Sequence, residues 1–306
     1  MKSRHALLLI FGLLAATLGA FSPAFRHSAN WINIIEQQSM IGIVACGMLL
    51  MILLGGFDLS VGAVGAAASV VAAWTMPRWG IACGVLAALL LGVAVGCFNG
   101  LLIAGLRINA FVATLGTQTL LTGLLLIGTG AMPVYGVPEA FSVIGLGRWG
   151  PVPIAALIYA SVAAGLAAML RFTVLGHHIY AVGGNAEASH LAGVRTRLVT
   201  VLVYLLGALT AAIAGLVLLA QTSIGQAGAA ASWPLNAIAA VAITGAPLTG
   251  GAGGMGAVVL GTLLLGTIAN ALNQFDISPY WQPAITGAVV LFAVAVDTLQ
   301  RNRTSS

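Results

Sequence analysis

Long apolar runs, separated by short polar or glycine-rich segments, occupy almost the whole chain. The runs are rich in Leu, Ala, Val and Ile and lack strict alternation, which favours helices over a β-barrel. A helix needs roughly 20 apolar residues to cross a bilayer, and fewer where it is broken or meets protein. The pattern predicts an all-α, polytopic membrane bundle of about ten transmembrane helices, forming a single domain over residues 1–306. The expected spans are 6–21, 39–54, 61–76, 81–105, 110–130, 151–170, 199–221, 236–247, 254–274 and 279–297.

Composition places the protein in lipid. Hydrophobic residues make up 60% of the chain, charged residues only 6%, and the mean hydropathy is +1.08. A soluble domain carries about 25% charged residues, so most of this surface faces a bilayer. The first apolar run resembles a signal peptide, but Phe21-Ser22-Pro23 is a poor cleavage site, and we expect a transmembrane helix there.

Basic residues set the expected orientation. An even number of spans puts both termini on one side, and cytoplasmic loops are enriched in Lys and Arg. With the termini inside, eight of the 11 basic residues are cytoplasmic, so the net charge of +5 reflects topology and not nucleic-acid binding. The same orientation makes 22–38 and 131–150 external and 171–198 the largest cytoplasmic loop. The cytoplasmic set is Lys2, Arg4, Arg107, Arg171, Arg195, Arg197, Arg301 and Arg303, and the external set is Arg26, Arg78 and Arg148.

The loop 171–198 is expected to contain a short helix at 186–192. Asn185 is a favourable N-cap, because its side-chain oxygen can accept from the first free backbone N–H groups. Glu187 lies in the first turn, where a negative charge meets the positive end of the helix dipole. Gly193 can adopt the left-handed conformation that ends a helix.

This short helix must dock against something, because an isolated helix of two turns is unstable in water. Ala188, Leu191 and Ala192 follow an i, i+3, i+4 spacing and form a small apolar face. One hypothesis is that the helix folds back on its own membrane domain. The other is that it inserts into a groove on a cytoplasmic partner.

The stretch LLGGFDLSVGAV, residues 53–64, places Asp58 and several glycines inside an apolar region. The glycines weaken the helix, and Ser60 is expected to cap a new helix at Val61. Asp58 can accept hydrogen bonds from the broken backbone or pair with an arginine such as Arg107. An ionisable group in the membrane is a functional candidate by default. Three interpretations stay open: a buried turn that orders two helices, a role in gating or coupling, and a proton relay, which a single intramembrane acid supports poorly.

Other polar residues within the apolar spans suit a neutral, hydroxylated solute. Uncharged amides and hydroxyls can hydrogen-bond such a solute, but they also tie neighbouring helices together. Gln118 is the preferred pathway contact, because it lies one turn beyond Thr114. The pathway or gating candidates are Asp58, Ser60, Asn99, Thr114, Gln118 and Asn236, and further polar positions are Gln221, Asn270 and Asn273.

A weak internal repeat is present. The segments 56–62 and 245–251 both fit G-x-x-L-[ST]-x-G between two hydrophobic runs. Gly-interrupted segments in the two halves of a transporter indicate its pathway. Glycine-rich membrane sequences also produce such matches by chance, so duplication and coincidence both remain open.

Several motifs together resemble one family. The segment 176–194 is similar to the cytoplasmic coupling loop of bacterial ABC importer permeases for monosaccharides, the ribose, xylose and galactose branch. LLGGFDLSVGAV, the FVATLGT at 111–117, the NAIAAV at 236–241 and the LTGG at 248–251 also match that family's patterns in order. His177 replaces the family's usual Arg, Pro234-Leu235-Asn236 replaces an acid–Leu–Asp run, and Ile243 to Pro247 replaces a commoner glycine pair. The resemblance implies ATPase coupling through Gly176, Tyr180, Gly184, Asn185, Glu187, Ala188, Leu191 and Gly193.

The resemblance also implies the partners. The chain has one lysine, Lys2, and so lacks the lysine of a Walker nucleotide site. We therefore expect no bound cofactor, ATP used by a cytoplasmic ABC ATPase, and solute delivered by a periplasmic or lipid-anchored binding protein. A second permease copy or a sister permease would complete a multi-pass assembly in the lipid of the bacterial cytoplasmic (inner) membrane.

Other functions are less consistent with the residues. A non-sugar solute and a stand-alone secondary transporter or channel remain alternatives. An intramembrane enzyme is disfavoured, because neither G-x-S-x-G nor H-E-x-x-H occurs, and we expect no catalytic residue. No metal site is expected, because the cysteines lie within apolar runs and the loop histidines lack companion ligands. These residues are Cys46, Cys83, Cys97, His177, His178 and His190.

Overall fold

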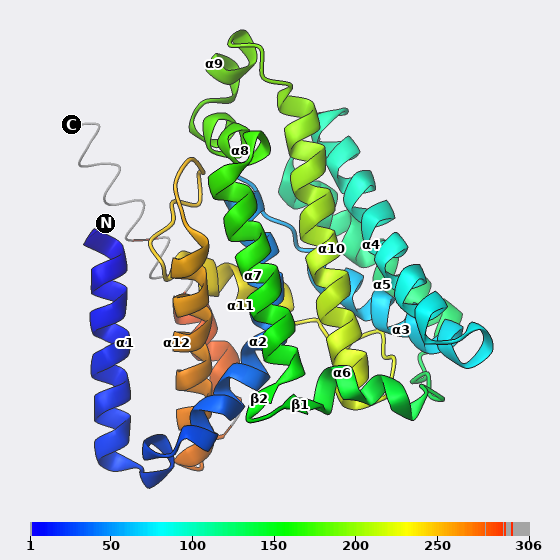
Figure 1. Ribbon diagram of the computed structural model, residues 1–306. Coiled ribbons are helices and arrows are strands. Elements are labelled where there is room, and N and C mark those ends of the chain that lie inside the picture. Colours follow the sequence, from blue (N-terminus) through cyan, green and yellow to red (C-terminus); the bar gives the residue numbers. More distant parts are fainter. Residues whose placement is uncertain (1, 279, 290, 292–294, 296–306) are drawn as a thin grey trace.

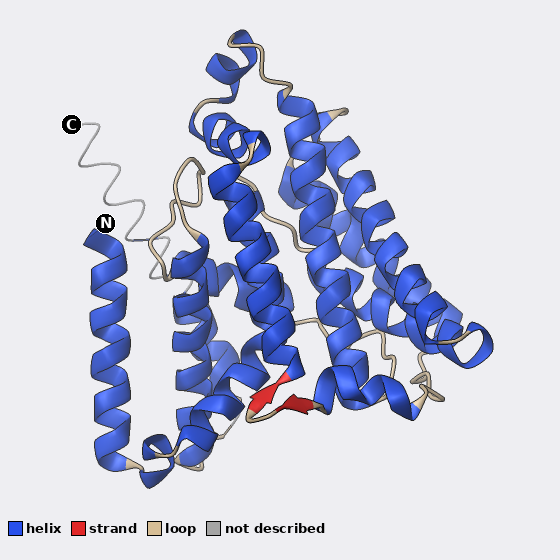
Figure 2. Ribbon diagram, viewed as in Figure 1, coloured by secondary structure: helices blue, strands red, loops and turns tan. Residues whose placement is uncertain are grey.

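The computed structural model describes residues 2–278, 280–289, 291 and 295, and shows a bundle of helices (Figures 1 and 2). The longer helices are α1 (Lys2–Phe21), α2 (Ser28–Leu53), α3 (Val61–Trp79), α4 (Ile81–Ala104), α5 (Ala110–Thr129), α7 (Ile154–Phe172), α10 (Thr196–Thr222), α11 (Trp233–Ala242) and α12 (Met255–Gln274). Short elements connect them: η1 (Pro23–Arg26), η2 (Glu139–Ser142), α6 (Val143–Leu146), α8 (Val174–Gly184) and α9 (Ala186–Leu191). One antiparallel hairpin pairs β1 (Arg148–Trp149) with β2 (Val152–Pro153), with Arg148 opposite Pro153.

Six helices of the described chain are long and apolar enough to cross a membrane: α2, α4, α5, α7, α10 and α12. The apolar part of α1, Leu7–Phe21, and α11 are shorter. The prediction of an all-α polytopic bundle is therefore confirmed in its coarse form. The last expected span, 279–297, includes residues that lie outside the described part of the chain.

Helices α2 and α10 form the centre of the bundle. Every residue of α2 from Ile43 to Leu53 is buried. Close helix contacts there require residues without side chains: a Cβ at Gly215 of α10 would overlap the carbonyl of Gly65 on α3. Small residues let helix backbones approach closely in membranes, where packing replaces the hydrophobic effect as the driving force.

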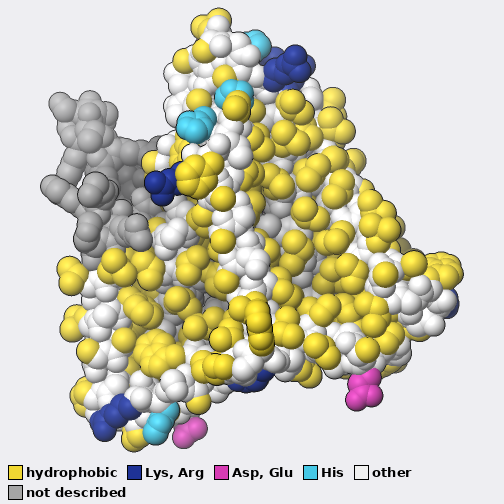
Figure 3. All heavy atoms as spheres, viewed as in Figure 1, with side chains coloured by type: hydrophobic (Ala, Val, Ile, Leu, Met, Phe, Trp, Pro, Cys, Tyr) yellow, Lys and Arg dark blue, Asp and Glu magenta, His cyan; other side chains and the backbone are white. Residues whose placement is uncertain are grey.

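The outer surface is apolar across the middle of the molecule. In Figure 3 hydrophobic side chains form a wide band, and charged side chains gather mainly toward the two ends. Helices α4 and α5 contribute strongly to this surface, with Leu90 58% and Ile127 81% exposed. This distribution is the one a lipid bilayer requires.

The structure moves several expected boundaries and adds short helices in the connecting segments. Helix α11 covers Trp233–Ala242, whereas the span is expected at 236–247. Helix α2 begins at Ser28, so most of the segment 22–38, expected to be an interfacial connection, is helical. This part packs on α12: Ile34 is buried, and Asn30 Nδ2 donates to Asn270 Oδ1 at 3.0 Å. Helix α8 differs from the expectation, since only a helix at 186–192 is predicted within the loop.

Candidate functional site

A buried polar network occupies the break between α2 and α3. Helix α2 ends at Leu53, and Gly55 adopts a φ of +77° that favours glycine. Asp58 and Ser60 are both 0% exposed. The Asp58 Oδ1 accepts from the backbone N–H of Ser60 at 2.6 Å and from its hydroxyl at 2.5 Å. The carboxylate therefore closes the turn before α3 begins.

Two neighbouring helices complete this network. Asn99 of α4 donates through Nδ2 to Ser60 Oγ at 2.9 Å and to Asp58 Oδ2 at 3.4 Å. The Asn99 Oδ1 accepts from the Thr117 hydroxyl of α5 at 2.6 Å. Thr114, also on α5, accepts at Oγ1 from the backbone N–H of Leu59 at 3.1 Å. The network thus fixes the break to α4 and α5.

One expectation about this turn is wrong, and of the two alternatives for Asp58 the structure shows hydrogen bonding from the broken backbone. Ser60 does not cap α3 with its side chain, because its hydroxyl is already used between Asp58 and Asn99. Arg107 forms no ion pair with Asp58; the one ion pair of the described residues joins Arg148 to Glu36 at 2.8 Å. Neutral donors satisfy the Asp58 carboxylate, as in a buried turn that orders two helices.

The structure brings together four of the six pathway candidates: Asp58, Ser60, Asn99 and Thr114. Gln118 stays outside the network, and the side chain that joins it is Thr117. Thr117 lies three residues beyond Thr114, on the same face of α5, and this spacing could have identified it. Asn236 is half-buried elsewhere, on α11. It lines a cavity of about 20 Å³ together with Gln38.

The second group of predicted residues lies on α8 and α9, at the far end of the molecule (Figure 1). Asn185 Oδ1 accepts from the Ala188 N–H at 2.9 Å, Glu187 lies in the first turn, and Gly193 has a φ of +88°. The N-cap and the glycine stop are thus confirmed, and α9 ends at Leu191. The predicted apolar face stays exposed, with Leu191 at 82%. Helix α9 therefore does not bury this face against its own membrane domain.

Helix α8 carries Gly176, Tyr180 and Gly184. Its own N-cap is Thr173, whose Oγ1 accepts from the Gly176 N–H at 3.1 Å. Gly176 has no room for a side chain, since a Cβ there would overlap the carbonyl of Leu170. At Gly184, by contrast, a Cβ would meet nothing within 4 Å.

The end of α8 meets the two glycine-rich breaks of the bundle at one point, here called the glycine junction (Leu53–Gly55, Gly183 and Thr249–Gly251). The N–H of Gly251 donates to the carbonyl of Leu53 at 2.9 Å. A Cβ at Gly183 would overlap this same carbonyl, and a Cβ at Gly55 would lie 2.7 Å from the Thr249 carbonyl. The residues just before the first G-x-x-L-[ST]-x-G segment are therefore in direct backbone contact with the end of the second.

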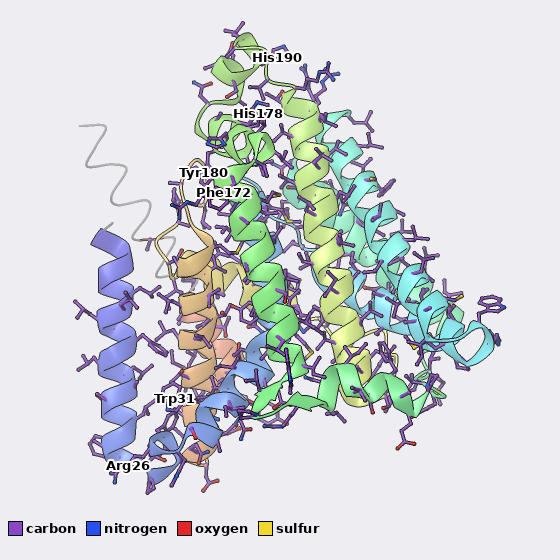
Figure 4. All side chains as sticks on the ribbon, in the orientation of Figure 1. Arg26, Trp31, Phe172, His178, Tyr180 and His190 are labelled. Carbon is purple, nitrogen blue, oxygen red and sulfur yellow. The ribbon has the colours of Figure 1, made fainter. Side chains whose placement is uncertain are left out.

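Tyr180 adds a side-chain link beside this junction (Figure 4). Its hydroxyl donates to the carbonyl of Gly253 at 2.9 Å, which ties α8 to the segment between α11 and α12. Partial burial raises the pKa of Tyr180 above its ordinary value.

Comparison with known proteins identifies the family of the chain. The family described as branched-chain amino acid transport system / permease component matches residues 30–294, which is most of the chain. The chain belongs to this permease family. No solved structure matches the permease.

Curated relatives cover the permease almost from end to end. The ribose import permease protein of Escherichia coli (strain K12) is 39% identical over 97% of this chain and 92% of its own length. The L-arabinose transport system permease protein of the same strain is 37% identical over 96% of this chain and 90% of its own length. The ribose import permease protein of Bacillus subtilis (strain 168) is 34% identical, over 93% and 89%.

The permease is thus a membrane subunit of an ABC importer, and ATP hydrolysis belongs to a separate subunit. In this permease, α8 and α9 correspond to the segment predicted to couple to that ATPase.

Proposed function

We propose that the permease forms the translocation pathway for a pentose or a similar monosaccharide in the bacterial inner membrane. The main support is that relatives named as ribose and arabinose permeases match this chain over nearly its whole length. The interior supports it, because its polar side chains are mainly hydroxyls and amides, which hydrogen-bond neutral polyols without a charge to neutralise.

The end that carries α8 and α9 is proposed to be cytoplasmic. His178, Tyr180 and His190 lie near this end, and Arg26 and Trp31 lie near the opposite one (Figure 4). Both termini would then be cytoplasmic, as the positive-inside rule predicts for an even number of spans. The solute-binding protein would dock at the opposite end, over η1, α6 and the β1–β2 hairpin.

The ATPase is proposed to bind α9. This helix is held at its start by Asn185 and at its end by Gly193, while Leu191 remains exposed. A preformed short helix with an exposed apolar residue suits insertion into a groove on a partner. A second copy or a sister permease would complete the pathway.

Movement of α9 would reach the pathway through the glycine junction. Helix α8 precedes α9 directly, and Gly183 at its end leaves no gap to Leu53. Because close-packed backbone segments cannot be compressed, displacement of α8 would move the end of α2 and the loop before α12 together. Asp58 lies five residues beyond Leu53, so the same movement would reach its network.

The substrate class is tested by uptake. The permease is expressed with its cognate ATPase and binding protein in a strain lacking its own sugar importers, and radiolabelled ribose, arabinose, xylose and leucine are supplied. The proposal predicts ATP-dependent uptake of a sugar. Uptake of leucine alone would overturn it, and accumulation by vesicles holding only the permease would indicate a stand-alone transporter.

The docking helix is tested separately. Leu191→Asp combined with Glu187→Arg should abolish co-purification of the ATPase and sugar uptake, while the permease still inserts in the membrane. The matched control is Leu146→Asp on α6, which is 58% exposed near the opposite end. Intact ATPase binding by the double variant would exclude α9 as the docking element.

A further inference from the structure

A cavity of about 650 Å³ opens between α8–α9, the turn from α4 to α5 and the start of α10. It is separate from the Asp58 network but reaches the same break, because Gly56 and Tyr204 line its inner end. The Tyr204 hydroxyl donates to the Phe57 carbonyl at 3.4 Å. The proposed coupling mechanism leaves this cavity without a role.

The charge of the cavity is entirely basic. Arg107 comes from the α4–α5 turn, and Arg195 and Arg197 come from the start of α10, with His190 of α9 beside them. No Asp or Glu lines it, and none of these arginines has an ion pair within the described residues. Three guanidinium groups that line one space without a carboxylate partner attract an anion that enters it.

The backbone of Arg107 is also unusual. Its φ is +59°, in the left-handed region that normally favours glycine. Non-glycine residues in this region are strained and tend to cluster at ligand-binding positions. A side chain stands here although glycine would fit the backbone better, and this side chain is one of the cavity's cations.

Part of the cavity wall is apolar, and apolar side chains are exposed beside the cavity. Leu54, Ile103 and Val182 line the interior. Next to Arg107, Leu106 is 70% and Phe111 46% exposed, and further apolar side chains such as Leu101 of α4 and Leu115 of α5 are exposed as well. A ligand that fits both surfaces has an anionic head and a hydrocarbon tail.

We propose that this cavity binds the phosphate headgroup of an anionic phospholipid from the leaflet at the α9 end. Guanidinium groups match phosphate oxygens with paired hydrogen bonds, and basic pockets between membrane helices on the cytoplasmic side suit such headgroups. The bound lipid joins the start of α10 to the α2–α3 break. The proposal rests on the orientation given above and not on the identity of the sugar.

The test uses the purified full-length permease in detergent with added phosphatidylglycerol or phosphatidylcholine, followed by thermal unfolding and native mass spectrometry. Phosphatidylglycerol should raise the unfolding temperature and remain bound, and phosphatidylcholine should not. Arg107→Gln and Arg197→Gln, made singly, should each weaken phosphatidylglycerol binding at least about tenfold, because each removes a charge-assisted hydrogen bond. Arg78→Gln, with the same charge change in the last turn of α3, should bind like the wild type.

Two further experiments distinguish the lipid headgroup from other anionic ligands of the cavity. Inorganic phosphate at millimolar concentration should give no comparable stabilisation; if it reproduces and displaces the phosphatidylglycerol effect, the lipid assignment is wrong. The arginine variants should still bind the ATPase in lipid-free detergent. If they lose the ATPase while retaining phosphatidylglycerol, the cavity receives an acidic protein segment and the proposal is overturned. Equal binding of both lipids also overturns it.

Discussion

The backbone N–H of Gly251 donates to the carbonyl of Leu53 at 2.9 Å, and Gly183 packs so closely that a Cβ there would overlap that same carbonyl. Three segments that are far apart in the sequence therefore meet through backbone alone. This contact predicts which glycines are intolerant of even one added methyl group.

Gly183→Ala should abolish uptake while the ATPase still binds, because the new Cβ overlaps the Leu53 carbonyl and displaces α8 from α2. Gly165→Ala on α7 is the control, since nothing lies within 4 Å of its Cβ position and it belongs to neither the glycine junction nor the predicted coupling residues. The measurement is sugar uptake set against ATPase co-purification for each variant. Normal uptake by Gly183→Ala would show that the junction does not transmit motion.

The cap of α9 should control ATPase affinity. Asn185→Ala removes the acceptor for the Ala188 N–H, and loss of an N-cap costs about 1 kcal/mol of helix stability. We expect roughly fivefold weaker ATPase binding, measured by titration in detergent or nanodiscs. Asn185→Asp should restore most of the affinity, because aspartate also caps well. A failure of this rescue would mean that Asn185 acts by direct contact.

The Asp58 network should contribute to stability. Asn99→Leu removes the donor to Ser60 and leaves the Thr117 hydroxyl without its acceptor on α4. Buried polar groups that lose a partner cost about 1–3 kcal/mol each, so the unfolding temperature should fall clearly. Thr119→Val is the control, because Thr119 is exposed and its hydroxyl bonds to Leu115 of its own helix. An unchanged unfolding temperature for Asn99→Leu would argue that water replaces the lost contacts.

Packing between α3 and α10 should be equally sensitive. Gly215→Ala should reduce the yield of folded permease, because its Cβ overlaps the Gly65 carbonyl and forces the helices apart. Gly165→Ala on α7, where nothing lies within 4 Å, should leave the yield unchanged. Size-exclusion chromatography of detergent-solubilised protein gives the comparison. Similar yields would mean that α3 and α10 can separate without loss of the fold.

Features that depend on residues close together in the chain are predicted well from the sequence. The helix α9 follows from Asn185 and Gly193, because capping depends on residues within one turn. Asp58 is identified because a carboxylate in an apolar run is rare and must find donors. The family motifs add the partners, which no local pattern supplies.

Features that depend on tertiary contacts are predicted poorly from the sequence. Helix α8 has a weak pattern of its own and depends on Tyr180 and Gly183, whose partners lie in distant loops. The hydroxyl of Ser60 has two possible uses, and the position of Asn99 on α4 decides between them. Thr117 and Gln118 lie three and four residues beyond Thr114, so helical spacing admits both as candidates, and the rotation of α5 within the bundle decides for Thr117.

The exposed Leu191 has a consequence for the abundance of the protein in the cell. An unpartnered apolar side chain on a marginal helix is what proteases and chaperones recognise. If the ATPase covers α9 as proposed, permease made in excess of its ATPase would leave Leu191 uncovered and be degraded, and the level of one subunit would follow the level of the other.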